Sequence, residues 1–325
     1  MISYLVNRVA QSLFVVLAMS IIVFAGLYII GDPVQVLVSP EATPEEIMQI
    51  RQRLGLDQPL VTQYFRFVTA AASGDLGNSF VYNESAITVI LRHFPATLEL
   101  ALTAMVISIL LGIPLGVWAG LRSETWSAKT IMAASTVGAS LPTFWVGLIL
   151  IMCFAVYLGW LPASGRGETR SVFGVDLSIL TLDGLSHILL PALNLALFKI
   201  SLVIRLARAG TREIVGQEFI KFARATGQSP ARVIFGHLLK NIMIPIVTVL
   251  GLEFGSVLAF SVVTERVFSW PGMGNLLVRS LFLLDRPIVV AYLMFTVVIF
   301  VVINFFVDLI YTFLDPRIRF AGKAA

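Results

Sequence analysis

Long apolar stretches recur six times along the chain, separated by polar segments of very different length. An α-helix needs about 20 residues to cross a bilayer, and each stretch is at least that long. The first is longer than the apolar part of a secretory signal, and no A-x-A site follows it, so we expect a retained helix. The pattern predicts six membrane-spanning helices, at residues 9–30, 96–121, 131–158, 187–206, 242–263 and 288–313.

The polar segment at residues 31–95 contains the signals of two short helices. Thr43–Glu46 has the residue order of a capping box, with Pro44 at the first helical position. Apolar residues then recur on one helical face as far as Gly55, and a second such stretch begins at Pro59. We expect short amphipathic helices that lie on the membrane surface or against the helix bundle.

The composition supports a membrane protein. Of the 325 residues, 58% are hydrophobic and 13% are charged, whereas soluble domains contain about 25% charged residues. This argues against a water-soluble globular fold and predicts an all-α membrane protein. Because the chain has no fixed-period repeat and no low-complexity linker, one membrane domain over residues 1–325 is the simplest organisation.

Basic residues beside the spans predict the orientation, because lysine and arginine are retained on the cytoplasmic side. If the amino terminus is cytoplasmic, that side carries 13 basic residues and the other side nine, four of them in the long first loop. Long loops translocate regardless of charge, so we expect both termini in the cytoplasm. The net charge of +4 follows from this bias, and we expect no nucleic-acid partner.

A search for catalytic motifs finds no G-x-x-x-x-G-K-[ST] phosphate loop, no H-E-x-x-H and no G-x-S-x-G. The histidines His93, His187 and His237 lie near span ends on different sides, and Cys153 is the single cysteine. We therefore expect neither a metal site nor a catalytic residue in this chain.

Four ionisable residues lie within the predicted spans, where a charge is costly and indicates a functional site or a pair inside the bundle. Glu99 follows Pro95 closely, and a helix N-terminus there would favour its charge. Asp308 lies a few residues from the cytoplasmic end, and Lys199 either snorkels to the interface or pairs with Glu253. A structural role is the simpler interpretation of each.

Small residues recur at helical spacing in two of the spans. Gly112, Gly116 and Gly120 form one row, and Gly251 and Gly255 repeat its spacing. Such rows allow a second helix to approach closely, and that helix belongs either to this chain or to another subunit. Each of the second to fifth spans also contains one proline, which permits a kink: Pro114, Pro142, Pro191 and Pro245.

The cytoplasmic loop at residues 211–241 predicts a helix–glycine–helix elbow. Gln217–Thr226 has the pattern of a short helix, and Gly227 suits the left-handed turn that ends it. Ser229 then caps a second helix, with Pro230 at its first position. The apolar side chains of the first helix need a cover, which is either the membrane interface or a groove on a partner protein. The apolar side chains are Phe219, Ile220 and Phe222, and the basic residues beside them are Lys221 and Arg224.

At this loop the sequence resembles the membrane subunits of binding-protein-dependent ABC importers, specifically the peptide/nickel permease family. The matching run is Gln217–Gly227, followed by His237–Asn241 and Ile244-Pro245. The wider superfamily has a Glu-Ala-Ala-x-x-x-Gly core, in which Lys221 and Phe222 here replace the Glu and the first Ala. Further matching segments follow in the family's order over nearly the whole chain: Gly31–Pro33, Arg53–Leu60, Gly74–Gly77, Pro95–Leu100, Leu158–Pro162, His187–Leu193, Val267–Gly274 and Asp315–Arg319.

The resemblance implies a six-helix subunit with the type I ABC importer permease fold in a bacterial inner membrane, in contact with membrane lipid. It implies a second related permease subunit, two cytoplasmic ATP-binding subunits that hold ATP and Mg, and an extracytoplasmic substrate-binding protein. This chain would bind no cofactor and have no enzymatic activity. The residues implied to couple it to the ATPases are Glu218, Phe219, Ile220, Lys221, Phe222, Ala223, Arg224 and Gly227.

The outer loop at residues 264–287 contains a glycine-rich turn on which we expect exposed aromatic side chains. We expect this turn to contact the binding protein or the mouth of the pathway, although packing on its own bundle is the alternative. The residues concerned are Phe268, Trp270, Gly272, Gly274 and Asn275.

Two other functions compete with the importer. A self-sufficient secondary transporter would require more intramembrane charges and two halves of similar sequence pattern, neither of which is visible. An intramembrane enzyme would need a reactive pair, for which only Lys199 and Glu253 are available. The resembling family takes up dipeptides, oligopeptides, nickel complexes, glutathione, opines and some sugars. Because no histidine or cysteine cluster favours nickel, we expect a peptide.

Overall fold

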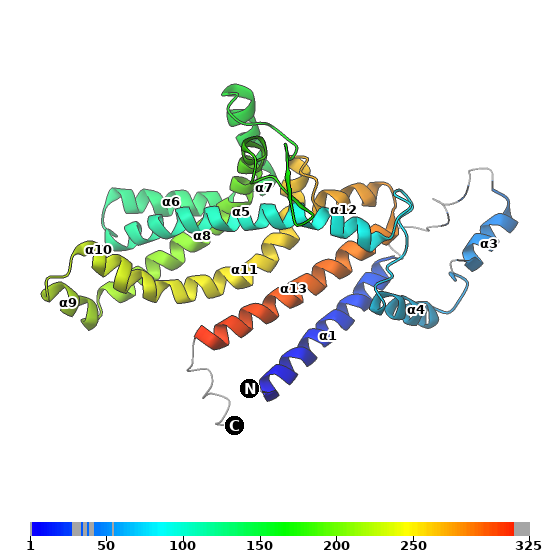
Figure 1. The fold of residues 1–325 in the computed structure, drawn as a ribbon, viewed down its shortest axis with the longest axis horizontal. Coiled ribbons are helices and arrows are strands. Elements are labelled where there is room, and N and C mark those ends of the chain that lie inside the picture. Colours follow the sequence, from blue (N-terminus) through cyan, green and yellow to red (C-terminus); the bar gives the residue numbers. More distant parts are fainter. Residues whose placement is uncertain (1, 28–33, 35–37, 39–41, 54, 315–325) are drawn as a thin grey trace. The chain divides into compact units, whose positions relative to one another are not determined.

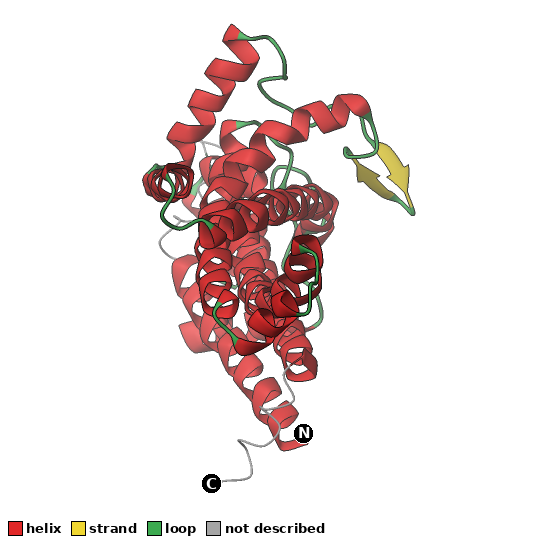
Figure 2. Ribbon diagram, turned by 90° about the vertical axis from the view of Figure 1, so that its left-hand side faces the viewer, coloured by secondary structure: helices red, strands yellow, loops and turns green. Residues whose placement is uncertain are grey.

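The computed structural model describes residues 2–27, 34, 38, 42–53 and 55–314. Apart from one two-stranded antiparallel hairpin, the regular elements in these ranges are helices (Figures 1 and 2). In chain order the elements are α1 (Ile2–Leu27), α3 (Pro44–Arg53), α4 (Leu60–Ala72), α5 (Ala86–Leu121), α6 (Trp126–Ser140), α7 (Thr143–Leu150), the π-helix η1 (Ile151–Tyr157), β1 (Arg170–Val172), β2 (Val175–Leu177), α8 (Leu182–Val215), α9 (Glu218–Ala225), α10 (Pro230–Arg232), the π-helix η2 (Val233–Leu238), α11 (Leu239–Val267), α12 (Met273–Phe282) and α13 (Arg286–Leu314).

The described residues contain five helices that are long and apolar enough to cross a membrane, and a bent pair that makes up to six. The five lie in α1, α5, α8, α10 to α11, and α13. The predicted third span is the bent pair, because α6 and the helix from α7 to η1 meet at an angle of 109°. The break falls at Leu141 and Pro142, both in extended conformation, and proline has no N–H with which to continue the helix. The all-α membrane fold is confirmed.

Helices extend beyond the apolar stretches from which they were predicted. α5 begins at Ala86 rather than at residue 96, and α8 continues to Val215 rather than ending at residue 206. The apolar pattern marks the part of a helix that suits hydrocarbon, whereas the backbone hydrogen bonds of the helix continue into polar sequence. Glu99 consequently lies well inside α5, and the predicted interaction with a helix N-terminus is wrong.

The chain forms two compact units. Unit one comprises residues 1–95 and 271–305, and unit two comprises residues 96–270 and 306–325. In unit one, α4 packs against α1: Ser20 Oγ lies 2.9 Å from Tyr64 Oη, and the ring of Phe24 packs against that of Tyr64. The capping box at α3 is confirmed, since Thr43 N donates to Glu46 Oε2 at 2.9 Å and Glu46 N to Thr43 Oγ1 at 3.4 Å.

In unit two, α8 packs against α5, α6 and α11. The glycine row of α5 faces α8 throughout. A Cβ placed at Gly112 would lie 2.7 Å from the Cβ of Val203, and one placed at Gly120 would lie 2.6 Å from the Cβ of Thr211. The row therefore serves packing within the chain. Gly251 of α11 is a similar close contact, because a Cβ there would lie 2.9 Å from Val307 Cγ2.

Replacing Gly116 with valine should destabilise unit two. A Cβ at this position would lie 2.6 Å from the Cβ of Ala207 and 2.7 Å from the carbonyl oxygen of Ile204, so α5 and α8 must separate. Overpacking of this kind costs about 1–3 kcal/mol. Gly138→Val is the matched control, because a Cβ at Gly138 in α6 meets nothing within 4 Å. Thermal unfolding in detergent should show a lower midpoint for Gly116→Val alone, and equal midpoints would contradict the packing role.

Candidate functional site

The predicted elbow is present at the end of α8 (Figure 1). α9 ends in a turn where Gly227 has a φ of +79°, in the left-handed region that favours glycine. Ser229 Oγ accepts the backbone N–H of Arg232 at 3.4 Å, and Pro230 occupies the first position of α10. His237 Nε2 and Gln228 Oε1, 2.9 Å apart, brace the turn against η2. The local signals for the elbow are thus confirmed.

One face of α9 is buried within the chain itself. Ile220 and Ala223 are 0% and 2% exposed, and they pack with Val233 of η2 and Ile214 of α8. The expectation that Ile220 lies exposed on the elbow is wrong. α9 is amphipathic, and its narrow apolar stripe faces the two elements that flank it. Ile220 and Ala223 hold the elbow together and do not form its surface.

The opposite face of α9 is open. Phe222 is 71% exposed and Phe219 is 44% exposed. Lys221 Nζ and Glu218 Oε1 form an exposed ion pair at 2.8 Å, and Arg224 is also exposed. This outer face of the elbow, formed by Glu218, Phe219, Lys221, Phe222 and Arg224, combines two aromatic rings with a charged rim. Such a surface suits a helix that fits into a groove.

Glu99 anchors the loop between η1 and α8. Its side chain is 2% exposed, and its Oε2 accepts Arg166 Nη2 at 2.7 Å while its Oε1 accepts the N–H of Ile179 at 2.9 Å. Arg166 also donates to Ser178 Oγ at 3.0 Å and to the carbonyl oxygen of Asp176 at 2.5 Å. Arg166 was not among the residues predicted from the sequence. Two features of the sequence could have indicated it: a carboxylate in an apolar helix needs a cation, and basic residues occur in the loop between η1 and α8.

The aromatic residues of the loop at residues 264–287 are buried. Phe268 and Trp270 are 1% and 0% exposed, so the expectation that they lie on an exposed turn is wrong. Trp270 Nε1 donates to the carbonyl oxygen of Ala96 at 2.9 Å, and Phe268 O accepts the N–H of Gly165 at 2.9 Å. Ser269 between them has a positive φ of 50° and is itself exposed. Gly272 and Gly274 are also buried, and Asn275 is half-buried.

Lys199 and Glu253 form an ion pair between α8 and α11, as one of the two sequence interpretations of Lys199 expected. Lys199 Nζ also donates to Ser256 Oγ at 3.0 Å, and Ser256 Oγ donates to Glu253 Oε2 at 2.9 Å. The three side chains form one polar cluster between apolar helices. The side chain of Asp308 lies outside the described part of the structure.

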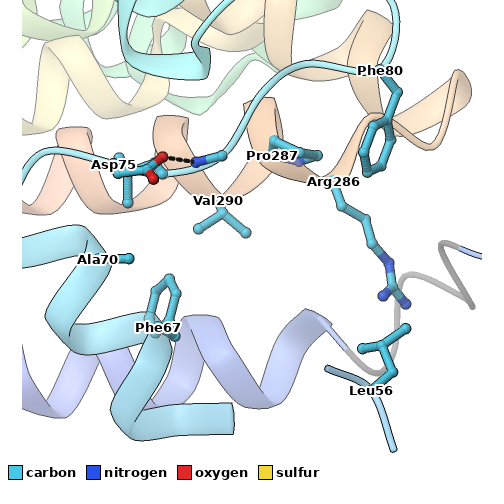
Figure 3. A pocket seen from close by; sticks show the side chains of 10 residues that line it. Leu56, Phe67, Ala70, Asp75, Phe80, Arg286, Pro287 and Val290 are labelled. Carbon is cyan, nitrogen blue, oxygen red and sulfur yellow. Dashed lines mark hydrogen bonds between the residues drawn. The ribbon is translucent and has the colours of Figure 1, made fainter. Parts of the chain in front are cut away.

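A cavity of about 330 Å³ lies in unit one (Figure 3). Its lining is mostly apolar, with Phe67 and Val290 turned towards it and Arg286 extended along one side. Asp75, the acidic residue of the lining, accepts the backbone N–H of Gly77 at 2.9 Å. This lining suits an apolar group better than a polar solute. Among the described residues, no three His, Cys, Asp or Glu side chains come together to hold a metal ion.

Comparison with known protein families identifies both parts of the chain. Residues 112–320 match the family described as binding-protein-dependent transport system inner membrane component. Residues 1–101 match the family described as the N-terminal part of the binding-protein-dependent transport system membrane component. Together the two matches cover nearly the whole chain.

Curated relatives match over their full length. The chain is 37% identical to the di/tripeptide transport system permease protein DppB of Pseudomonas aeruginosa (strain UCBPP-PA14), covering 98% of this chain and 99% of that protein. It is 33% identical to the dipeptide transport system permease protein DppB of Alkalihalophilus pseudofirmus, over 98% and 100% of the two chains. It is 34% identical to the glutathione transport system permease protein GsiC of Escherichia coli (strain K12), again over 98% and 100%.

A solved structure shares the fold. The inward-facing methionine ABC transporter MetNI superposes with a TM-score of 0.53 at 16% identity, over 70% of this chain and 96% of the MetNI chain. The resemblance at this identity concerns the arrangement of the helices, and it confirms the fold class expected from the sequence.

Arg166→Met should destabilise the protein strongly, because it leaves the Glu99 carboxylate buried without its cation. Removing one partner of a buried pair costs about 3–5 kcal/mol. Arg92→Met is the matched control: Arg92 and Glu84 also lie 2.7 Å apart, but their side chains are 59% and 44% exposed, and such pairs contribute about 1 kcal/mol or less. Thermal unfolding of both variants tests this, and equal losses would argue against an anchoring role for Glu99.

Proposed function

The chain belongs to the family of binding-protein-dependent transport system inner membrane components, and from that membership we propose that it imports peptides with energy from separate ATPase subunits. It is a membrane permease subunit of an ABC importer, and its family supplies the membrane part of such systems rather than the ATPase. We assign ATP and Mg to two partner subunits, and half of the solute pathway to a second, related permease. An extracytoplasmic binding protein would deliver the solute.

The elbow is the observation that carries the proposed coupling. Its inner face is held by the chain itself, because Ile220 and Ala223 pack against Ile214 of α8 and Val233 of η2, so we expect the elbow to move together with these two elements. Its outer face leaves Phe222 and Phe219 without cover in this chain. A rigid protrusion with exposed aromatic rings is what a docked ATPase needs to transmit a movement to the membrane helices. We therefore keep the outer face and Gly227 as the coupling residues.

The proposed orientation places the elbow and both termini in the cytoplasm. The support is the excess of basic residues on the side of the chain that carries the elbow, because positively charged loops are retained there. The loop anchored by Glu99 and Arg166 then lies outside, together with the turn that contains Ser269. We propose that the exposed residues of that turn contact the binding protein. They are Arg266, Ser269 and Pro271.

The proposed solute is a di- or oligopeptide or a related small peptide. Full-length relatives are named for di/tripeptide, dipeptide and glutathione transport. These solutes share a free ammonium group, a carboxylate and at least one amide bond. A secondary transporter is disfavoured, because the family matched by this chain works with a binding protein.

Affinity purification of the chain from its native membrane tests the assembly. We expect a second permease and ATP-binding subunits to co-purify, and the complex in liposomes to take up labelled dialanine or glutathione when ATP and the binding protein are supplied. Recovery of the chain alone, under conditions that preserve other membrane complexes, would contradict the proposal. Uptake of neither solute by the whole complex would contradict the peptide assignment.

Gly227→Val should uncouple ATP hydrolysis from uptake while membrane insertion stays normal. Valine is strained at a φ of +79°, although the site has free space around it, so the turn must change direction. Gly216→Val is the matched control, because Gly216 ends α8 at a φ of −79° that any residue adopts. We expect hydrolysis without uptake for Gly227→Val and near-normal uptake for Gly216→Val. Full uptake by Gly227→Val would refute the coupling role of the elbow.

A further inference from the structure

Lys199 and Glu253 place two charges near the middle of membrane-spanning helices. Glu253 lies midway along α11, and Lys199 lies near the centre of the apolar stretch of α8. A charged side chain at such a depth is costly, and it faces the bundle interior or a water-filled cavity rather than lipid. Two apolar residues at these positions would pack α8 against α11 with a smaller desolvation free energy than the charged pair requires.

The pair is asymmetric in exposure. The side chain of Lys199 is 10% exposed, whereas that of Glu253 is 34% exposed. The ammonium group of Lys199 donates to Glu253 Oε2 and to Ser256 Oγ, so the cation is enclosed by its partners. Glu253 Oε1 accepts no hydrogen bond within the described part of the chain. The open side of the cluster therefore presents a carboxylate oxygen.

An exposed carboxylate oxygen at this depth requires water or a ligand on its open side. Lipid offers it no hydrogen bond, and each unsatisfied polar group in hydrocarbon costs several kcal/mol. The face of α8 and α11 that bears Glu253 therefore suits contact with water or a polar ligand better than contact with lipid. A carboxylate already held in place by a lysine and a serine is well suited to bind a positively charged group, because its orientation is set before the ligand arrives.

We propose that Glu253, held by Lys199 and Ser256, lines the solute passage and binds the ammonium group of the passing solute through Oε1. The inference rests on the proposed function and adds a specificity-determining residue to it. The contact is a charge-assisted hydrogen bond of the R–NH₃⁺ to carboxylate type. Lys199 is a positioning residue, which balances the carboxylate charge when no solute is present.

A charge swap separates this role from a purely structural ion pair. Lys199→Glu combined with Glu253→Lys keeps an ion pair between α8 and α11 but presents an ammonium group to the passage. We expect uptake of the dipeptide or glutathione that the wild-type complex transports to fall about tenfold or more. Membrane insertion and co-purification of the ATPases should persist. Uptake within about twofold of wild type would overturn the proposal, because a structural pair is restored by the swap.

Cysteine accessibility tests the same site without removing the ion pair. Ser256→Cys is made in a Cys153→Ser background, which leaves one thiol in the chain. We expect both a cationic and an anionic methanethiosulfonate to modify this thiol, and the cationic one to react faster, because Glu253 Oε1 lies on the open side of the cluster. Leu110→Cys is the control, since Leu110 is an apolar side chain that is 65% exposed in α5. A Ser256→Cys thiol as unreactive as that of Leu110→Cys would overturn the proposal.

The two failures can be told apart. If the wild-type complex takes up neither dialanine nor glutathione, the peptide assignment fails, while the labelling of Ser256→Cys still decides whether water reaches the Lys199–Glu253–Ser256 cluster. If the wild-type complex transports and the swapped variant transports equally well, the importer stands and the role of Glu253 falls. In the Ser256→Cys variant, which keeps Lys199 and Glu253, addition of the transported solute should slow labelling by the cationic reagent.

Discussion

The close approach of α5 and α8 is the contact on which the rest of unit two depends. Lipid is as apolar as leucine, so membrane helices gain little from burying apolar surface and rely on close packing instead. Glycines at three successive turns of α5 bring its backbone against α8, with the carbonyl oxygen of Ile204 at the centre. This contact fixes the line of α8, and α8 in turn carries partners along its whole length.

α8 lies beside three sets of contacts along its length. Near its first turns the Glu99 and Arg166 pair holds the preceding loop, and Asn194 Nδ2 donates to Thr264 Oγ1 of α11 at 3.0 Å. Lys199 meets Glu253 at mid-depth, and Ile214 supports the inner face of the elbow. The charged pair and the elbow are therefore joined by one continuous helix, without a loop between Lys199 and Ile214.

Features governed by neighbouring residues could be predicted from the sequence. Gly227, Ser229 and the Thr43–Glu46 capping box behave as expected, because a turn or a cap depends on a few adjacent residues. The burial of Ile220 depends on how α8 and η2 fold back on α9, which the pattern of α9 alone does not show. The burial of Phe268 and Trp270 could not be predicted, since they contact Gly165 and Ala96, which are distant in sequence. The partner of Glu99 was missed for the same reason: Arg166 is 67 positions away, in a loop without a periodic pattern. The 109° bend follows from Pro142 in hindsight, but other prolines, such as Pro191, lie inside unbroken helices.

One face of α9 packs against its own chain and the other is open. This division has a consequence for the evolution of the subunit. Substitutions at Phe219, Phe222 or Arg224 alter the shape and charge offered to another protein without disturbing the packing of Ile220 and Ala223. A duplicated copy of the gene can therefore acquire a different exposed surface on one side of a single short helix, while the packing that holds the helix in place is unchanged.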